Sequence, residues 1–111
     1  MKVHLKSISL ANGTSFKDFK PARPDDFHVT LRLTIGKDVA IRESHHSLYI
    51  CTPNWLAQET QAKGPVTARH TLIVSHFEPA QITASIQQLI DQCQRPAWAD
   101  TLSALTHFFA A

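Results

Sequence analysis

The sequence contains little glycine and little cysteine: three glycines and two cysteines in 111 residues. The glycines, Gly13, Gly36 and Gly64, lie far apart, so there is no glycine-rich loop of the kind that cradles a nucleotide phosphate. A chain of this length buries enough apolar surface for one hydrophobic core without a disulfide or metal staple. We therefore expect Cys51 and Cys93 to be buried as small apolar side chains, and we expect no cofactor.

Long apolar runs and clustered charge are also missing. No run approaches the ~18 apolar residues of a membrane-spanning helix. Residues 1–6 alternate between charged and apolar, unlike the apolar core of a signal peptide. The net charge is only +2 with neutral histidines, and the basic residues are scattered, whereas nucleic-acid binding needs clustered Lys and Arg. These absences predict a cytoplasmic protein with one domain, spanning 1–111, whose partners are neither nucleic acid nor membrane.

Histidine is abundant, with seven in the chain, and this invites a metal hypothesis. Zinc ligands usually occur in patterns such as CxxC, HxxxH or HExxH, and none of these is in the sequence. His45 and His46 are adjacent, so on a strand they point to opposite faces. We expect no metal, and a site assembled from distant strands is the alternative.

Cys51 is the strongest candidate for a nucleophile because it precedes Thr52-Pro53, a typical helix start. The N-terminus of a helix can lower the pKa of a thiol. The same residues are also fully explained as the end of an apolar strand followed by a helix cap. We therefore predict that the chain is not an enzyme, with a small metal- or thiol-dependent enzyme as the alternative.

The alternation of apolar and polar residues predicts four strands, at 3–10, 27–35, 39–50 and 66–76. The phase of the alternation shifts at Ser7, which predicts a β-bulge. It shifts again near 43–46, between Ile41 and Leu48, which predicts a second bend or bulge. The segment 11–26 contains Asn12-Gly13 and two prolines, so we expect it to be a loop.

Helices are expected after Thr52-Pro53, Pro79 and Pro96, each followed by helical residues or an apolar stripe. The element order β-β-β-α-β-α-α predicts an α+β protein: an antiparallel sheet of about four strands with helices packed on one face. The predicted core consists of Val29, Leu31, Leu33, Trp55, Leu72, Val74, Ile86, Leu89, Trp98 and Leu105.

A side chain that packs in the core cannot also face a partner, so the polar side of the predicted hairpin is the candidate binding face. An open sheet face with arginine, histidine and acids suits a polar protein interface, in which arginines act as anchors. The predicted partner-binding residues are His28, Thr30, Arg32, Arg42, Glu43, His45 and His46, with Asp25 and Asp26 from the adjoining loop. The alternative is a solvated sheet face, with the partner docking on helices or loops elsewhere.

Three segments occur together: CTPNWL at 51–56, after the hairpin strand; RHTLIV at 69–74; and a following helix with a second helix that contains tryptophan. The N-terminal strand, the loop with aspartate and proline, and the strand led by Phe27 precede them. In this order the sequence resembles the immunity protein 8 family of bacterial polymorphic toxin systems. The resemblance covers nearly the whole chain.

The resemblance implies a cytoplasmic antitoxin in bacterial competition. Such a protein binds a cognate toxin domain of a polymorphic or contact-dependent toxin system and covers its active site or an essential surface. No catalytic residue is implied, and Trp55, Leu56 and His70 are implied to specify the fold. The chain departs from the family in charge, because the family members are markedly acidic and this chain is slightly basic. A general protein-interaction module is a further alternative.

Overall fold

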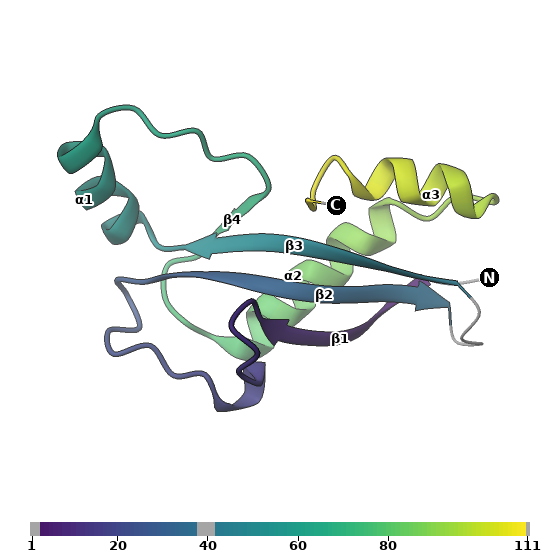
Figure 1. The fold of residues 1–111 in the computed structure, drawn as a ribbon, viewed down its shortest axis with the longest axis horizontal. Coiled ribbons are helices and arrows are strands. Elements are labelled where there is room, and N and C mark those ends of the chain that lie inside the picture. Colours follow the sequence, from purple (N-terminus) through teal and green to yellow (C-terminus); the bar gives the residue numbers. More distant parts are fainter. Residues whose placement is uncertain (1–2, 38–41, 111) are drawn as a thin grey trace.

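The computed structural model describes residues 3–37 and 42–110. Its strands are β1 (Val3–Leu10), β2 (His28–Lys37), β3 (Glu43–Cys51) and β4 (Thr71–Ile73). Its helices are a short 3-10 turn η1 (Phe16–Asp18), α1 (Pro53–Lys63), α2 (Pro79–Gln92) and α3 (Trp98–Leu105). The α+β class and the element order predicted from the sequence are confirmed (Figure 1).

The strands form one sheet in the order β1-β2-β3-β4. β1 and β3 each pair antiparallel with β2, but β4 runs parallel to the end of β3, with Tyr49 opposite Thr71 and Cys51 opposite Ile73. The sheet is therefore mixed, where we expected it to be antiparallel. The reason is the connection: α1 lies between β3 and β4 and carries the chain back, as a crossover helix does between parallel strands.

The two irregularities predicted in the strands have different outcomes. The bulge in β1 is confirmed, because the register between β1 and β2 shifts between Leu5 and Ser7. The bend predicted near 43–46 is wrong, because β2 and β3 pair without a shift from Gly36 and Glu43 to His28 and Cys51. The predicted strand positions 39 and 41, whose phase suggested that bend, lie outside the described residues.

α2 lies across one face of the sheet and closes the hydrophobic core (Figure 1). Its residues Ile82, Ile86 and Ile90 recur at helical spacing and are at most 1% exposed. Leu105 at the end of α3 and Phe109 beyond it join the same cluster. α1 does not take part in this layer. It stands at the end of β3, and none of its residues is buried.

Most of the predicted core is confirmed. Leu31, Leu33, Ile86 and Leu105 are buried, and Val29, Leu72, Val74, Leu89 and Trp98 are partly buried against the cluster. The prediction is wrong for Trp55, whose ring stacks on the His28 ring with the centroids 4.4 Å apart. Because α1 has no buried stripe, its tryptophan packs on the outer side of β2 and not in the core.

Thr52 joins β3 to α1 and is fully buried. Its Oγ1 accepts hydrogen bonds from the backbone N–H groups of Trp55, at 3.4 Å, and Phe27, at 3.1 Å. The predicted helix cap is thereby confirmed, and the same hydroxyl ties the start of β2 to the start of α1. The helix ends at Gly64, whose φ of 82° is a conformation that glycine adopts without strain.

The outer edge of β1 is bonded to side chains of α2 and to the end of that helix. Gln94 accepts from the backbone N–H of Val3 and donates to its carbonyl, at 3.0 and 2.8 Å, and Gln87 accepts from the N–H of Leu5 at 3.0 Å. Further along, Ser9 forms a bridge with Ser15. Backbone groups on the outward side of this strand are thus paired within the molecule.

Leu33 provides a test of the core. It is 1% exposed and lies under α2, so Leu33→Ala removes buried methyl groups and leaves a cavity. We expect the free energy of unfolding to fall by about 2–5 kcal/mol, measured by urea denaturation. The matched control is Ile73→Ala, an aliphatic side chain that is 49% exposed, which should change stability by less than about 1 kcal/mol. Equal losses at both positions would contradict this assignment of faces.

Candidate partner-binding face

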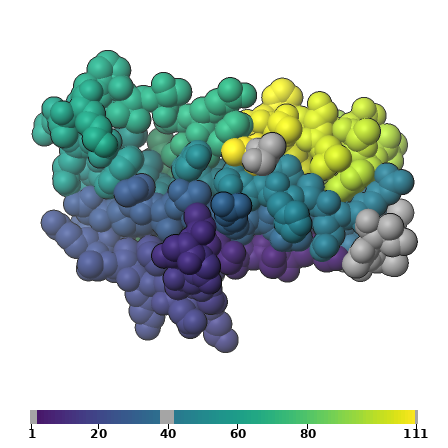
Figure 2. Space-filling model, viewed as in Figure 1, coloured from purple at the N-terminus to yellow at the C-terminus, as the bar shows by residue number. Residues whose placement is uncertain are grey.

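The side of the sheet that points away from α2 is exposed, and we call it the open face. Side chains alternate along each strand, so the residues paired across β1, β2 and β3 fall on this face in rows. It carries Ser7, Ser9, His28, Thr30, Arg32, Thr34, Glu43, His45, Ser47 and Tyr49. Figure 2 shows this side: the strands form a broad central surface, flanked by α1 with its following segment and by α3.

Arg32 stands near the middle of the open face, opposite Ser9 on one side and Ser47 on the other. Its neighbours line a polar hollow of 380 Å³ that also includes His45 and Thr34. His45 Nδ1 lies 3.2 Å from Thr34 Oγ1, across the β2–β3 pair. This centre therefore offers a guanidinium, an imidazole and several hydroxyl groups to a polar partner.

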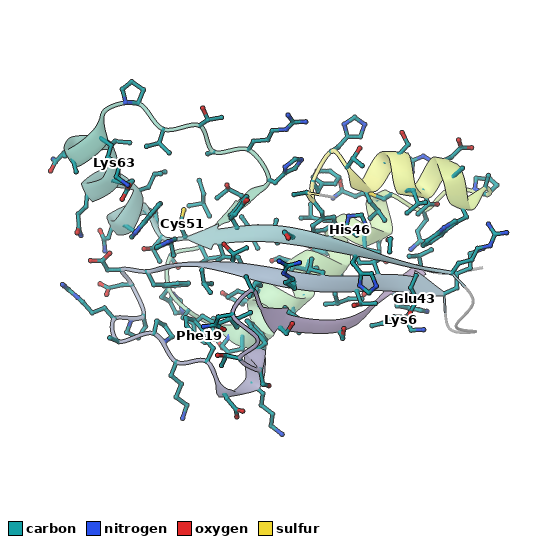
Figure 3. The ribbon with its side chains drawn as sticks, viewed as in Figure 1. Lys6, Phe19, Glu43, His46, Cys51 and Lys63 are labelled. Atoms are coloured by element: carbon teal, nitrogen blue, oxygen red, sulfur yellow. The ribbon has the colours of Figure 1, made fainter. Side chains whose placement is uncertain are left out.

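Glu43 marks the hairpin end of the open face. Its carboxylate lies 3.5 Å from Lys6 Nζ, which also donates to the carbonyl of Lys37 at 3.1 Å. Figure 3 shows Lys6 and Glu43 beside one another at this end of the sheet. Gly36 pairs with Glu43, and a Cβ there would lie 2.5 Å from the Arg42 carbonyl oxygen, so a larger residue does not fit. Arg42 itself is exposed just before β3.

Asp25 and Asp26 lie at the opposite end, where the loop before β2 meets α1. The carbonyl of Asp25 accepts a hydrogen bond from Asn54 at 2.9 Å. The carboxylate of Asp26 accepts one from Gln58 at 2.8 Å and lies 3.9 Å from the guanidinium of Arg23. These contacts give Asp26 a role in holding α1 against the loop. Because β2 rises by about 3.3 Å per residue, the two ends of the open face, at His28 and Gly36, lie roughly 26 Å apart.

Among the predicted site residues that lie in strands, His46 points away from the open face. It is 5% exposed and points toward the core, where its ring lies 6.1 Å from that of Phe109 and its Nε2 lies 2.7 Å from Ser44 Oγ. The prediction that His46 helps to form an exposed surface is therefore wrong. The reason is the uninterrupted alternation of β3, which puts His45 outside and His46 inside.

A pocket that the sequence analysis missed adjoins the open face at α1. α1 and the segment 64–70 stand over the end of β3 and enclose a volume of 270 Å³, which we call the α1 pocket. Its walls include Tyr49, Trp55, Leu56, Val66 and Arg69. The alternation of β3 could have placed Tyr49 on the open face. Val66 and Arg69 gave no such signal because 66–70 was predicted to be strand and is a loop.

The cysteines do not have the chemistry of activated thiols. Cys51 is 3% exposed at the junction of β3 and α1, the position labelled in Figure 3. Burial raises the pKa of the Cys51 thiol and also that of Cys93, the reverse of the effect expected from activation at a helix N-terminus. Within 3–37 and 42–110, no group of three or more His, Cys, Asp or Glu side chains is placed to hold a metal ion.

None of the helices in the described part of the chain is long and apolar enough to cross a membrane. The fold and site thus define a class: a small α+β domain with one sheet face closed by helices and the other exposed and polar. Comparison of the sequence with protein families gives a match to Immunity protein 8 over residues 3–110. No curated protein and no solved structure matches the chain.

The chain belongs to the Immunity protein 8 family, because the match covers nearly its whole length. The resemblance seen in the sequence is thereby confirmed. Membership makes it an immunity protein of toxin systems and implies a toxin protein as its partner. Proteins of such families are generally not enzymes.

The buried His46 makes stability depend on pH. Burial lowers the pKa of His46, an effect opposed by the backbone of Ala110 and reinforced by His45. The unfolded chain therefore binds a proton more readily than the folded protein. As pH falls below about 6.5, the ordinary histidine value, we expect the free energy of unfolding to decrease. The measurement is urea denaturation between about pH 8 and 5 for the wild type and His46→Gln.

The difference in stability between wild type and His46→Gln should shrink as the pH falls. His107→Gln serves as the control because His107 is exposed, so its profile should follow that of the wild type. Parallel curves for wild type and His46→Gln across the whole range would rule out His46 as the source of the dependence.

Proposed function

We propose that this protein is a cytoplasmic, non-catalytic immunity protein that binds a cognate toxin domain of a polymorphic or contact-dependent toxin system and neutralises it. In this proposal the toxin contacts the open face, including His28, Thr30, Arg32, Glu43 and His45, and the bound immunity protein covers the toxin's active site or another essential surface. Neither nucleic acid nor a membrane is a partner. The observation that carries the proposal is the family match together with the exposed polar face.

The chemistry of the open face supports its use as an interface. Interfaces of this kind are polar at the rim and use arginine among their few dominant contacts. Arg32 stands exposed in the middle of this face and forms no ion pair with a described residue. Because Arg32 has no ion pair to break, a partner's carboxylate can approach it and form a charge-assisted hydrogen bond.

The proposal is tested by co-expression with candidate toxin domains, beginning with any that is encoded beside this gene. Arg32→Glu combined with Arg42→Glu reverses one charge in the middle of the open face and one that is exposed at its hairpin end, and we expect the double variant to lose protection while it remains folded. The measurement is survival of cells that express the toxin, with circular dichroism of the purified variant as the check on folding.

Lys17→Glu combined with Lys20→Glu is the matched control, because it makes the same change in charge. Lys17 lines a groove against α2 on the far side of β1. Lys20 is exposed in the loop that follows η1, and neither lysine belongs to a strand of the open face. The control should protect as the wild type does. Full protection by the folded Arg32 and Arg42 double variant would place the interface on another surface.

A further inference from the structure

The α1 pocket is a small cavity that adjoins the open face. At 270 Å³ it is smaller than the about 300–1,000 Å³ of sites that enclose a small-molecule ligand. It opens beside the proposed contact surface, since His28 and Tyr49 of the open face line it. A pocket of this size next to an interface suits a single large side chain of a protein partner.

We propose, building on the proposed function, that the α1 pocket receives one large apolar side chain of the toxin. We further propose that acidic residues beside that side chain on the toxin pair with Arg69 and Arg32. The toxin surface that faces this protein would then be an apolar anchor surrounded by carboxylates.

The apolar part of the proposal rests on exposed side chains. Tyr49, Val66 and Ile73 are the large hydrophobic residues that are exposed in the described chain, at 46%, 38% and 49%. Tyr49 and Val66 line the α1 pocket, whereas Ile73 lies outside it, in a separate hollow beside α2. Exposed apolar side chains that gather in one place mark interaction sites, and tyrosine, tryptophan and arginine are the residues most enriched among binding hot spots.

The side chains that line the pocket carry positive charge, which favours an acidic partner. Arg69 and His28 line the pocket, and no acidic residue is among the described residues that do so. Arg69 is exposed and forms no ion pair with a described residue. On the adjoining elements the carboxylates of Glu59 and Asp26 are already paired, with Lys63 and Arg23. Positive charge without a local counter-charge favours a partner that supplies carboxylates.

The walls of the pocket are held in place before a partner binds. Trp55 is stacked on His28 with an angle of 25° between the ring planes. His70, at the end of the 64–70 segment, donates from its ring to the Thr106 carbonyl at 3.0 Å, and its own carbonyl accepts from Tyr49 at 3.0 Å. Its φ of 55° is a conformation that few non-glycine residues adopt. Because these walls are already fixed, less conformational entropy is lost when a partner binds.

The test measures, by calorimetry with the full immunity protein, the dissociation constant for a catalytically inactive form of the toxin domain against which the protein protects in the co-expression test. Tyr49→Ala and Val66→Asp should each weaken binding about 30-fold or more, as expected for loss of a buried anchor. Ile73→Ala is the matched control: it removes an equally exposed apolar side chain that does not line the pocket. Its affinity should stay within about 3-fold of the wild type.

Arg69 is tested through the salt dependence of binding. The affinity of the wild type should fall as sodium chloride is raised from about 50 to 300 mM, because salt screens exposed charge pairs. Arg69→Glu should weaken binding and flatten this dependence, whereas Arg69→Lys should retain most of the affinity. A wild-type affinity that does not change with salt would overturn the acidic part of the proposal.

A fluorescence measurement reports on the pocket itself. The chain has two tryptophans, so Trp98→Phe leaves Trp55 as the only one. Addition of the inactive toxin should shield Trp55 from quenching by acrylamide. Unchanged quenching in a complex that has formed would place the toxin elsewhere.

The outcomes separate the two proposals. If the wild type does not bind the toxin, both the proposed function and this inference fail. If the wild type binds and the folded variants Tyr49→Ala, Val66→Asp and Arg69→Glu bind as tightly, the proposed function stands and the α1 pocket is not the anchor site. Self-association of the toxin-free protein in sedimentation, lost in Tyr49→Ala, would assign the pocket to a second copy of this chain and overturn the inference.

Discussion

The alternation of side chains along β2 and β3 is the constraint on which the rest of the molecule depends. α2 covers one side of these strands, so a shift of pairing by one residue would exchange the core with the exposed surface. The pairing of β2 with β3 has no such shift between Gly36 and His28. One uninterrupted ladder therefore sets both the buried cluster and the row that presents Arg32 and His45 to a partner.

Periodicity explains which parts of the structure could be predicted. The long strands and α2 are regular, so their faces follow directly from the sequence, and the arginine at 32 was placed on the exposed side on that ground. The prediction failed for His46 because its phase was set from positions 39 and 41, which lie outside the described residues, whereas β3 alternates without a break from Glu43 to Cys51. The strand predicted at 66–76 is only three residues long, because 66–70 alternates in sequence but is a loop. The parallel direction of β4 was out of reach, because alternation carries no information on strand direction. Trp55 was misplaced because a large apolar residue on a helix was taken as core, although α1 has no stripe to bury.

Polar contacts at the end of β3 position α1 and the segment that follows it. Thr52 fixes the start of α1 against β2, Gln58 of that helix bonds to Asp26, and His70 ties the returning segment to α3. The bond from Phe27 to Thr52 is buried beside the core, and the other two are exposed. They hold a helix without buried residues in a defined place, and so create the α1 pocket from elements that the hydrophobic pattern alone does not position.

The glutamine contacts along β1 protect an exposed strand edge from pairing with another chain. An edge strand with free backbone groups is a template on which another chain can add a strand, and this is a common start of aggregation. Gln94 and Gln87 occupy the outward groups of Val3 and Leu5, and the bridge from Ser15 covers Ser9. The bulge in β1 further twists this edge away from a flat partner. The paired groups of Val3, Leu5 and Ser9 are therefore closed to strand addition by a second chain.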